Sequence, residues 1–446
     1  MHRSLALAPA LLLALAPLSS AGPAADVATQ LREGALTPQE AAGAWATQAV
    51  TPQAALEALQ ALPLREAPPK DHTATLTDDQ GRESACRVLV PADGPAEDGR
   101  YRVMILLHGL GGDWRQAVKG SDGLIPPHTL VLCPSALRSE PGDLFEDLRT
   151  AGAALPLGRL LRCWFTYQPD AFPLAALEYA RERYPIDPDR VILAGYSMGG
   201  FSAWNVGLRY HDRFAGLLPM AGGISREEYL FQKDPWCRIL LDNAAMVPTF
   251  FIHGGRDEVV PVVFDRWTDQ ELTARGIEHT YVEVKGGKHV LDEFRDPLGD
   301  VKRQLREWTA ARVREPHPAK VVHRLIGEYH PGAYWVRVDG YQGNTARVEA
   351  EVTGRSRIEV STRGVSRLTV FLDPALVDVE GEVELVVDGQ PAFTGRVEPS
   401  LEAVAASWAR TRDPALTYAH AVSVEVTPRE VEELKSGLDG LFKQKK

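Results

Sequence analysis

Strand patterns alternate with helix patterns between about residues 72 and 314, and this alternation is the strongest constraint on the fold. Several of the strand patterns are apolar throughout, such as residues 103–107 (Val-Met-Ile-Leu-Leu) and 191–194 (Val-Ile-Leu-Ala). A strand needs an unbroken apolar run when helices cover both faces of its sheet. The sequence therefore predicts an α/β fold with a doubly wound, mostly parallel sheet.

The elements expected in this region alternate along the chain. The strands are predicted at residues 85–90, 101–107, 130–133, 191–194, 216–220, 249–253 and 279–284. The intervening helices are predicted at residues 174–184, 198–210, 264–275 and 300–313.

Residues 1–21 are typical of a secretory signal, with a positively charged start, an apolar run over residues 5–18 and small residues after it. A membrane anchor is the alternative, but the run is short and contains Pro9 and Pro17. We therefore expect a mature chain that begins near Gly22, is periplasmic or secreted, and has no membrane segment.

Four further segments follow the signal. Residues 22–71 predict a helical N-terminal segment, which is either a packing appendage or a removable pro-segment. Residues 72–314 carry the alternating pattern. In residues 319–396 the apolar positions recur with a period of two, which predicts a small antiparallel, β-rich C-terminal domain. Residues 397–446 predict a helical C-terminal tail, whose last helix opens at Thr427.

Charge and cysteine usage limit the partners and metals. The formal net charge is −11, without a long basic block, which disfavours nucleic acid as a partner. Cys86, Cys133, Cys163 and Cys237 permit two disulfides in an oxidising compartment, in three possible connectivities. We favour the Cys163–Cys237 pair, because each lies beside a tryptophan on an expected loop. The four cysteines are too scattered to predict a zinc site, and we predict no metal.

Residues 195–200 read Gly-Tyr-Ser-Met-Gly-Gly and lie between an apolar strand and a helix pattern. A serine becomes a nucleophile when it is exposed, when a base removes its proton, and when donors face the charge that it creates. A tight strand-to-helix turn exposes the side chain and requires small neighbours at Gly195 and Gly199. We predict Ser197 as the nucleophile; the alternative is an ordinary tight turn.

A second glycine-rich stretch, residues 108–112 (His-Gly-Leu-Gly-Gly), follows the strand at 101–107. A loop with few side chains lets backbone N–H groups approach a reacting carbonyl. We assign the oxyanion hole to the N–H groups of Met198 and Leu110, with Gly109 as the alternative to Leu110. We expect His108 to be structural. The fingerprints of nucleotide-binding loops are absent from the sequence.

A base and an orienting acid follow two later strands. Asp257 and His289 come after Ser197 in the chain order Ser–Asp–His. We predict that His289 takes the proton of Ser197 and returns it to the leaving group, while Asp257 orients the imidazole. His253 and Glu258 are the weaker alternatives for the base and the acid.

Taken together, HGLGG, GYSMGG, GGRDEVVP and GGKHV resemble the motifs of the α/β-hydrolases. The chain is similar to the carboxylesterase, feruloyl esterase and polyhydroxybutyrate depolymerase-like group; dienelactone hydrolases and the catalytic domains of prolyl oligopeptidases are more distant. The resemblance covers roughly residues 80–314 and implies an eight-stranded sheet and hydrolysis without a cofactor. The N-terminal segment is too short for the β-propeller of prolyl oligopeptidases, which counts against a peptidase.

We therefore expect an exported serine esterase that cleaves small-molecule or polymeric carboxylic esters through an acyl-enzyme on Ser197. One alternative is a serine peptidase or amidase of the prolyl oligopeptidase-like type. The other is a non-catalytic binding protein built on a hydrolase scaffold. No pattern in the sequence specifies the ester or the oligomeric state.

Aromatic residues are the only indication of what the chain binds. Those that could contact a substrate lie in two long connections, the second of which could form a small lid: Trp164, Phe165, Tyr167 and Trp236. Those that could bind a glycan lie in the β-rich domain: Tyr334, Trp335 and Tyr341. The alternatives are that the first set packs its own loops, and that the second forms the core of a domain that acts as a spacer or scaffold.

Overall fold

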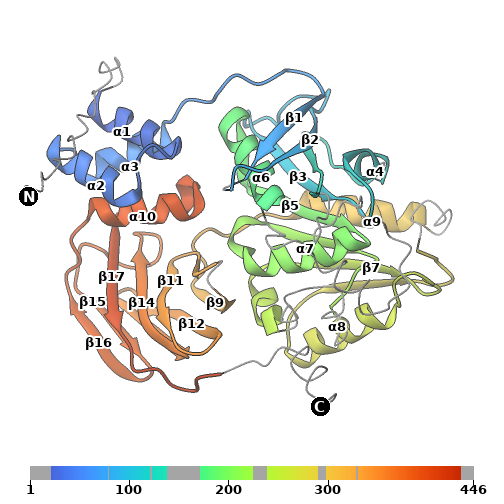
Figure 1. Cartoon of the computed structure of the whole chain (residues 1–446). Coiled ribbons are helices and arrows are strands. Elements are labelled where there is room, and N and C mark those ends of the chain that lie inside the picture. The colour runs from blue at the N-terminus through green and yellow to red at the C-terminus, as the bar shows by residue number, and fades with distance from the viewer. Residues whose placement is uncertain are drawn as a thin grey trace, which may run out of the picture. The chain divides into compact units, whose positions relative to one another are not determined.

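A computed structural model of the chain describes residues 22–78, 80–120, 123–137, 171–224, 239–289, 298–327 and 330–432. The chain divides into two compact units (Figure 1). The smaller unit combines Met1–Leu62 with Pro399–Ala419, and the larger combines Pro63–Glu398 with His420–Lys446.

An eight-stranded sheet is the centre of the larger unit. Its strands are β1 (His72–Thr77), β2 (Glu83–Leu89), β3 (Tyr101–Leu107), β4 (Thr129–Pro134), β5 (Ile186–Tyr196), β6 (Gly216–Met220), β7 (Phe250–Gly254) and β8 (Thr280–Val284). They are arranged in the order β1-β2-β4-β3-β5-β6-β7-β8. The strands from β4 to β8 in this order are parallel, whereas β1 with β2 and β2 with β4 pair in antiparallel fashion. The predicted mostly parallel sheet is confirmed.

Helices follow the strands of this sheet, as Figure 1 shows. They are α4 (Trp114–Gly120), α6 (Ala171–Arg183), α7 (Met198–Arg209), α8 (Val263–Ala274) and α9 (Leu298–Ala311), with the 3₁₀ segments η1 (His211–Arg213) and η3 (Ile239–Met246). In the apolar run of β3, Ile105 packs into one hydrophobic core with Trp204 of α7, and its neighbour Met104 packs into a second core with Leu305 of α9. Because successive side chains of a strand point to opposite faces, the unbroken apolar run serves two cores.

The β-rich part of the larger unit forms two further sheets. Its strands are β9 (Lys320–Ile326), β10 (Gly332–Ala333), β11 (Val336–Tyr341), β12 (Thr345–Gly354), β13 (Arg357–Arg363), β14 (Val365–Leu372), β15 (Val383–Val387), β16 (Gln390–Gly395) and β17 (His420–Glu425). The strand orders are β10-β11-β14-β17 and β16-β15-β13-β12-β9. All pairs are antiparallel except β13 with β15. Tyr334 and Trp335 are buried, so they belong to the core and are not available for stacking on a glycan.

The prediction of a helical tail over residues 397–446 is wrong for most of its described part. Only α10 (Leu401–Thr411) and the short 3₁₀ segment η5 (Pro414–Leu416) are helical, and β17 then pairs with β14. Residues 427–432, where the last helix was expected to begin, form neither helix nor strand. Residues 422–425 (Val-Ser-Val-Glu) alternate apolar with polar side chains, which is the period of a strand, and Val422 is buried.

The smaller unit is built from helices. They are α1 (Pro23–Arg32), α2 (Pro38–Thr47), α3 (Pro52–Gln60) and α10. Thr37 and Glu40 form a reciprocal capping box at the start of α2. Trp45 of α2 and Trp408 of α10 share one buried apolar core. Because α10 completes this core, the described packing favours the appendage alternative over a removable pro-segment.

Within the larger unit, buried histidines connect the 3₁₀ segment η1 to the β-rich part. His211 Nε2 lies 3.2 Å from His323 Nδ1, and His323 Nε2 donates to the carbonyl oxygen of His330 at 2.9 Å. Burial lowers the pKa of His330 well below its usual value, and the charge of Arg209 lowers it further. Neither ring nitrogen of His330 has a hydrogen-bond partner among the described residues.

The neutral state of His330 predicts acid sensitivity. Below the ordinary histidine pKa of 6.5, the unfolded chain binds a proton at this position that the folded chain excludes. The free energy of unfolding should therefore fall as the pH drops below about 6.5, by up to about 1.4 kcal/mol per pH unit from this side chain. Urea unfolding at pH 7.5 and 5.5 should show a smaller loss for His330→Phe; equal losses would contradict the assignment.

Candidate active site

Ser197 occupies a strained turn between β5 and α7. Its backbone has φ 57° and ψ −120°, in the region that non-glycine residues rarely adopt. The Ser197 N–H donates to Met220 O at 2.8 Å, and the N–H groups of Gly200 and Phe201 donate to Ser197 O. These backbone bonds hold the turn from both sides. The turn projects the hydroxyl beyond the carboxyl end of the sheet.

Two glycines permit this turn because neighbouring backbone leaves no room for a side chain. A Cβ placed on Gly195 would lie 2.0 Å from Gly199 O, and one placed on Gly199 would lie 2.3 Å from Leu107 O. The glycines at the second position before and after Ser197 are therefore required by direct backbone contact, as the sequence pattern predicts.

The structure brings Ser197, His289 and Asp257 into one hydrogen-bonded chain. His289 Nε2 lies 2.9 Å from Ser197 Oγ, and His289 Nδ1 lies 2.6 Å from Asp257 Oδ2. These residues follow β5, β8 and β7, whose carboxyl ends meet at one edge of the parallel sheet. With its Nδ1 proton donated to Asp257, the ring keeps a lone pair at Nε2 that can accept the serine proton.

Asp257 is fixed by its own surroundings. Its side chain is fully buried, and Oδ1 accepts the N–H groups of Val259 and Val260, each at 2.8 Å. The other oxygen therefore faces His289 in a single orientation. A carboxylate held in this way can orient an imidazole and stabilise its protonated form.

Tyr196 also holds His289, and the sequence analysis did not identify it. The Tyr196 hydroxyl donates to His289 O at 2.5 Å, and the two ring centroids are 5.2 Å apart. The side chain adjacent to the serine thus restrains the loop that carries the histidine. No pattern in the sequence distinguishes this tyrosine from any other residue at the variable position of the motif.

The glycine-rich loop after β3 approaches the serine. A Cβ on Gly109 would lie 3.4 Å from Ser197 Cβ. The Gly109 N–H is already donated to Gln116 Oε1 at 2.7 Å, whereas the N–H groups of Leu110 and Met198 have no acceptor within the described part of the chain. This difference favours Leu110 and Met198 over Gly109 as free donors for an oxyanion.

His108 has a structural environment, in line with the expectation for it. Its side chain is buried; Nδ1 lies 2.7 Å from Gly109 O, and Nε2 accepts the Ala136 N–H at 2.9 Å. The ring therefore connects the glycine-rich loop to the segment after β4. Gln116 of α4 holds the same loop from the other side, and the sequence analysis missed it because its contact depends on the side-chain rotamer.

The weaker alternatives for base and acid do not reach the serine. His253 is fully buried, with Nδ1 2.7 Å from Asp265 Oδ2 and Nε2 3.2 Å from Asp257 Oδ2. It contacts the same carboxylate oxygen of Asp257 as His289 does, and no contact with Ser197 is found among the described residues. Glu258 is exposed to solvent.

Several predicted residues lie outside the described part of the chain. They are residues 1–21, the favoured disulfide pair Cys163 and Cys237, and the candidate substrate contacts Trp164, Phe165, Tyr167 and Trp236. Cys86 and Cys133 are free, buried thiols. They belong to the cores on opposite faces of the sheet, which rules out a bridge between them. Burial raises the pKa of Cys133 to about 12.

The described residues show neither a metal-binding cluster nor a membrane-spanning helix. Among the described residues, no three His, Cys, Asp or Glu side chains gather closely enough to hold a metal ion. No helix in the same residues combines the length and the apolar character needed to cross a membrane.

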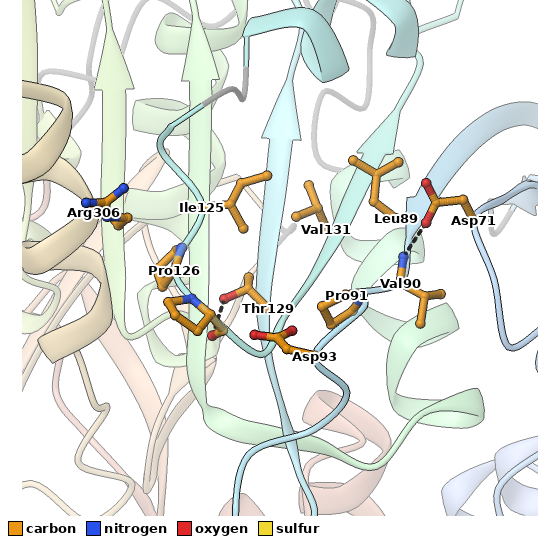
Figure 2. Close-up of a pocket in the computed structure, with 11 residues that line it drawn as sticks. Asp71, Leu89, Val90, Pro91, Asp93, Ile125, Pro126, Thr129, Val131 and Arg306 are labelled. Carbon is orange, nitrogen blue, oxygen red and sulfur yellow. Dashed lines mark hydrogen bonds between the residues drawn. The ribbon is translucent and has the colours of Figure 1, made fainter. Parts of the chain in front are cut away.

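A groove of about 580 Å³ lies apart from this site, and Figure 2 shows the side chains that line it. It lies between the end of β2, the start of β4 and Arg306 of α9, whereas Ser197 lies beyond the opposite ends of the parallel strands. Its lining residues are Asp71, Leu89, Val90, Pro91, Asp93, Ile125, Pro126, Pro127, Thr129, Val131 and Arg306. None of the predicted site residues is among them.

Comparison with known proteins identifies the type of domain. Residues 171–309 match a family model described as Phospholipase/Carboxylesterase. Lysophospholipase-like protein 1 of Mus musculus is 24% identical over 129 residues, which are 29% of this chain and 49% of that protein. An uncharacterized secreted protein of Arthroderma benhamiae is 31% identical over 122 residues, 23% of this chain and 13% of that protein. A solved ferulic acid esterase aligns at 17% identity with a TM-score of 0.40, covering 53% of this chain and 97% of that one.

The matched family region contains Ser197, Asp257 and His289. The chain spans about half the length of the mouse relative and a smaller share of the fungal one. Together with the eight-stranded sheet, the family match confirms the resemblance to esterases of the α/β-hydrolase fold.

The contacts around the turn predict that Gly195→Ala destabilises the larger unit and suppresses whatever chemistry Ser197 performs. The new Cβ must displace the Gly199 carbonyl, and overpacking of this kind typically costs about 1–3 kcal/mol or more. Thermal unfolding measures the effect. Gly120→Ala in α4 is the control, because a Cβ there meets nothing within 4 Å, and equal stability of the two variants would refute the close-contact argument.

Proposed function

We propose that the chain is an exported serine esterase that cleaves carboxylic esters through an acyl-enzyme on Ser197. The observation that carries the proposal is the pair of contacts made by His289, 2.9 Å to the serine hydroxyl and 2.6 Å to the carboxylate of Asp257. A buried acid, an imidazole and a hydroxyl in this order form an activated nucleophile.

Acylation begins when Ser197 Oγ attacks the carbonyl carbon of the ester and its proton passes to His289 Nε2. The negative charge that develops on the carbonyl oxygen is met by the N–H groups of Leu110 and Met198. Each such donor typically lowers the barrier by about 3–4 kcal/mol. When the tetrahedral intermediate collapses, His289 gives its proton to the departing alcohol, and the acyl group stays on Ser197.

Deacylation repeats these roles with water. His289 takes a proton from the water as its oxygen attacks the acyl-serine, and then returns it to Ser197 Oγ as the carboxylic acid leaves. Throughout both steps Asp257 stabilises the imidazolium, while its bonds to Val259 and Val260 keep the carboxylate in place. The scheme needs no cofactor.

The substrate class is inferred from the family match. The family match described as Phospholipase/Carboxylesterase supports an ester, and either a small-molecule or a polymeric ester is compatible with it. Export is supported by the signal-like pattern of residues 1–21 and by the secreted fungal relative. We assign the substrate contacts to Trp164, Phe165, Tyr167 and Trp236, whose aromatic rings suit an aryl or acyl group.

Ser197→Ala should abolish labelling by a fluorophosphonate probe and lower the hydrolysis of p-nitrophenyl acetate by at least about 10³-fold. The matched control is Ser202→Ala, at a buried serine one turn further along α7, which should leave both readouts near those of the parent chain.

Retention of hydrolysis by Ser197→Ala would contradict the proposal. A panel of peptides and amides run beside the esters separates an esterase from a peptidase with the same machinery. Preferential cleavage of the peptides would favour the peptidase.

A further inference from the structure

His253 is a buried, titratable side chain that the reaction scheme leaves unused. It lies near the end of β7, four positions before Asp257 in the chain, and it has no exposed surface. Its Nε2 lies 3.0 Å from Val260 O and 3.2 Å from Asp257 Oδ2, and its Nδ1 lies 2.7 Å from Asp265 Oδ2. The ring therefore bridges α8 and the acid that holds His289.

The hydrogen-bond partners of the His253 ring indicate which of its nitrogens carry a proton. Every recorded neighbour of its two nitrogens is an oxygen that accepts hydrogen bonds, so a lone pair at either nitrogen would face a carbonyl or carboxylate oxygen. A ring with a proton on both nitrogens satisfies all three contacts. Burial alone would lower the pKa of His253, but the hydrogen bond and the charge of Asp265 outweigh it and raise the pKa above its ordinary value.

The carboxylate of Asp265 pairs with His253. Its side chain is completely buried, and Oδ1 has no hydrogen-bond partner among the described residues. An ionised carboxylate in such a place is costly unless a cation pairs with it. The carboxylate and the imidazolium of His253 thus form a buried ion pair directly behind the acid of the site.

We propose that His253, which Asp265 keeps in its charged form, is a positioning residue. It holds Asp257 in place and thereby adjusts the strength of His289 as a base. This inference rests on the proposed function, since it concerns the same site. Asp257 Oδ2 lies between two imidazoles, His289 at 2.6 Å and His253 at 3.2 Å, while Oδ1 is held by two backbone N–H groups. The carboxylate is thereby locked in rotation.

The positive charge of His253 has a second effect. It offsets part of the negative charge of Asp257, and so weakens the electrostatic stabilisation that Asp257 gives to a positive charge on the His289 ring. The other titratable groups near this pair are Tyr281 and Glu283 of β8 and Arg266 of α8. Arg266 binds Glu283 at 2.6 and 2.7 Å, and the Tyr281 hydroxyl donates to Glu283 at 3.2 Å. Burial and the charge of Asp265 raise the pKa of Tyr281, so its hydroxyl stays neutral. The hydrogen bond and the charge of Arg266 lower the pKa of Glu283, so Glu283 stays ionised over the working range.

Asp265→Asn tests the proposal with little change of shape. Asn accepts the Nδ1 proton without supplying a charge, so His253 becomes neutral and its Nε2 no longer donates to Asp257. We expect the acid limb of the kcat/KM profile for p-nitrophenyl acetate to move up by about one pH unit, and kcat to fall about tenfold.

Asp269→Asn is the matched control. Asp269 lies one turn further along α8 and also pairs with a histidine, 3.0 Å from His279 Nε2, but it does not touch Asp257. The same substitution there should leave the acid limb and kcat unchanged. A similar shift in both variants would show a general effect of the helix and overturn the assignment.

Two further measurements keep the test decisive if Asp265→Asn folds poorly. His253→Gln removes the charge on the other partner and should move the acid limb in the same direction, and the double variant should behave like either single one because the pair acts as a unit. In proton NMR, the low-field resonance of the proton between His289 and Asp257 should move in each variant.

An unmoved acid limb and an unmoved resonance, with hydrolysis still dependent on Ser197, would overturn the role of His253 and leave the esterase intact. Hydrolysis that no longer depends on Ser197 would instead overturn the proposed function. The two failures are therefore distinguishable.

Discussion

Close backbone contact at the turn between β5 and α7 is the constraint on which the rest of the site depends. Gly195 meets the backbone of Gly199, and Gly199 meets Leu107 of the neighbouring strand, at distances that exclude any side chain. This contact forces Ser197 into a positive-φ conformation and aims its hydroxyl beyond the sheet. It also places the start of α7 beside the glycine-rich loop that follows β3, so that the proposed nucleophile and its proposed N–H donors are assembled by the same packing.

The parallel sheet brings together residues that are far apart in the chain. Because β5, β7 and β8 run in the same direction, the residues that follow them meet at one edge, although Ser197 and His289 are far apart in the chain. The loops are then held by specific bonds, from Tyr196 to the His289 carbonyl and from Asp257 to two backbone N–H groups. Behind them, His253 and Asp265 add a buried charge pair whose proposed effect is electrostatic rather than chemical. A rigid scaffold with fixed dipoles of this kind is what stabilisation of a developing charge requires.

The sequence predicted the structure well where a local pattern determines it. Unbroken apolar runs located the inner strands, and the glycines around Ser197 located the turn, because both are requirements of the backbone itself. The sequence was a poor guide where packing between segments that are far apart in the chain determines the structure. The core shared by Trp45 and Trp408 joins two ends of the chain, and β17 takes its place in a sheet through its pairing with β14. The contact of Gln116 with Gly109 and the pairing of His253 with Asp265 depend on rotamers and on the approach of a helix, which no spacing in the sequence reveals.

The central claim is that Ser197, activated by His289, carries the acyl group between the two halves of the reaction. Mass spectrometry of the chain quenched during steady-state hydrolysis of p-nitrophenyl acetate tests this claim most directly. The account predicts an acetyl group on the peptide that contains Ser197, and its absence from a His289→Ala variant. Rapid hydrolysis without any acetylated peptide, or with the acetyl group on another residue, would contradict it.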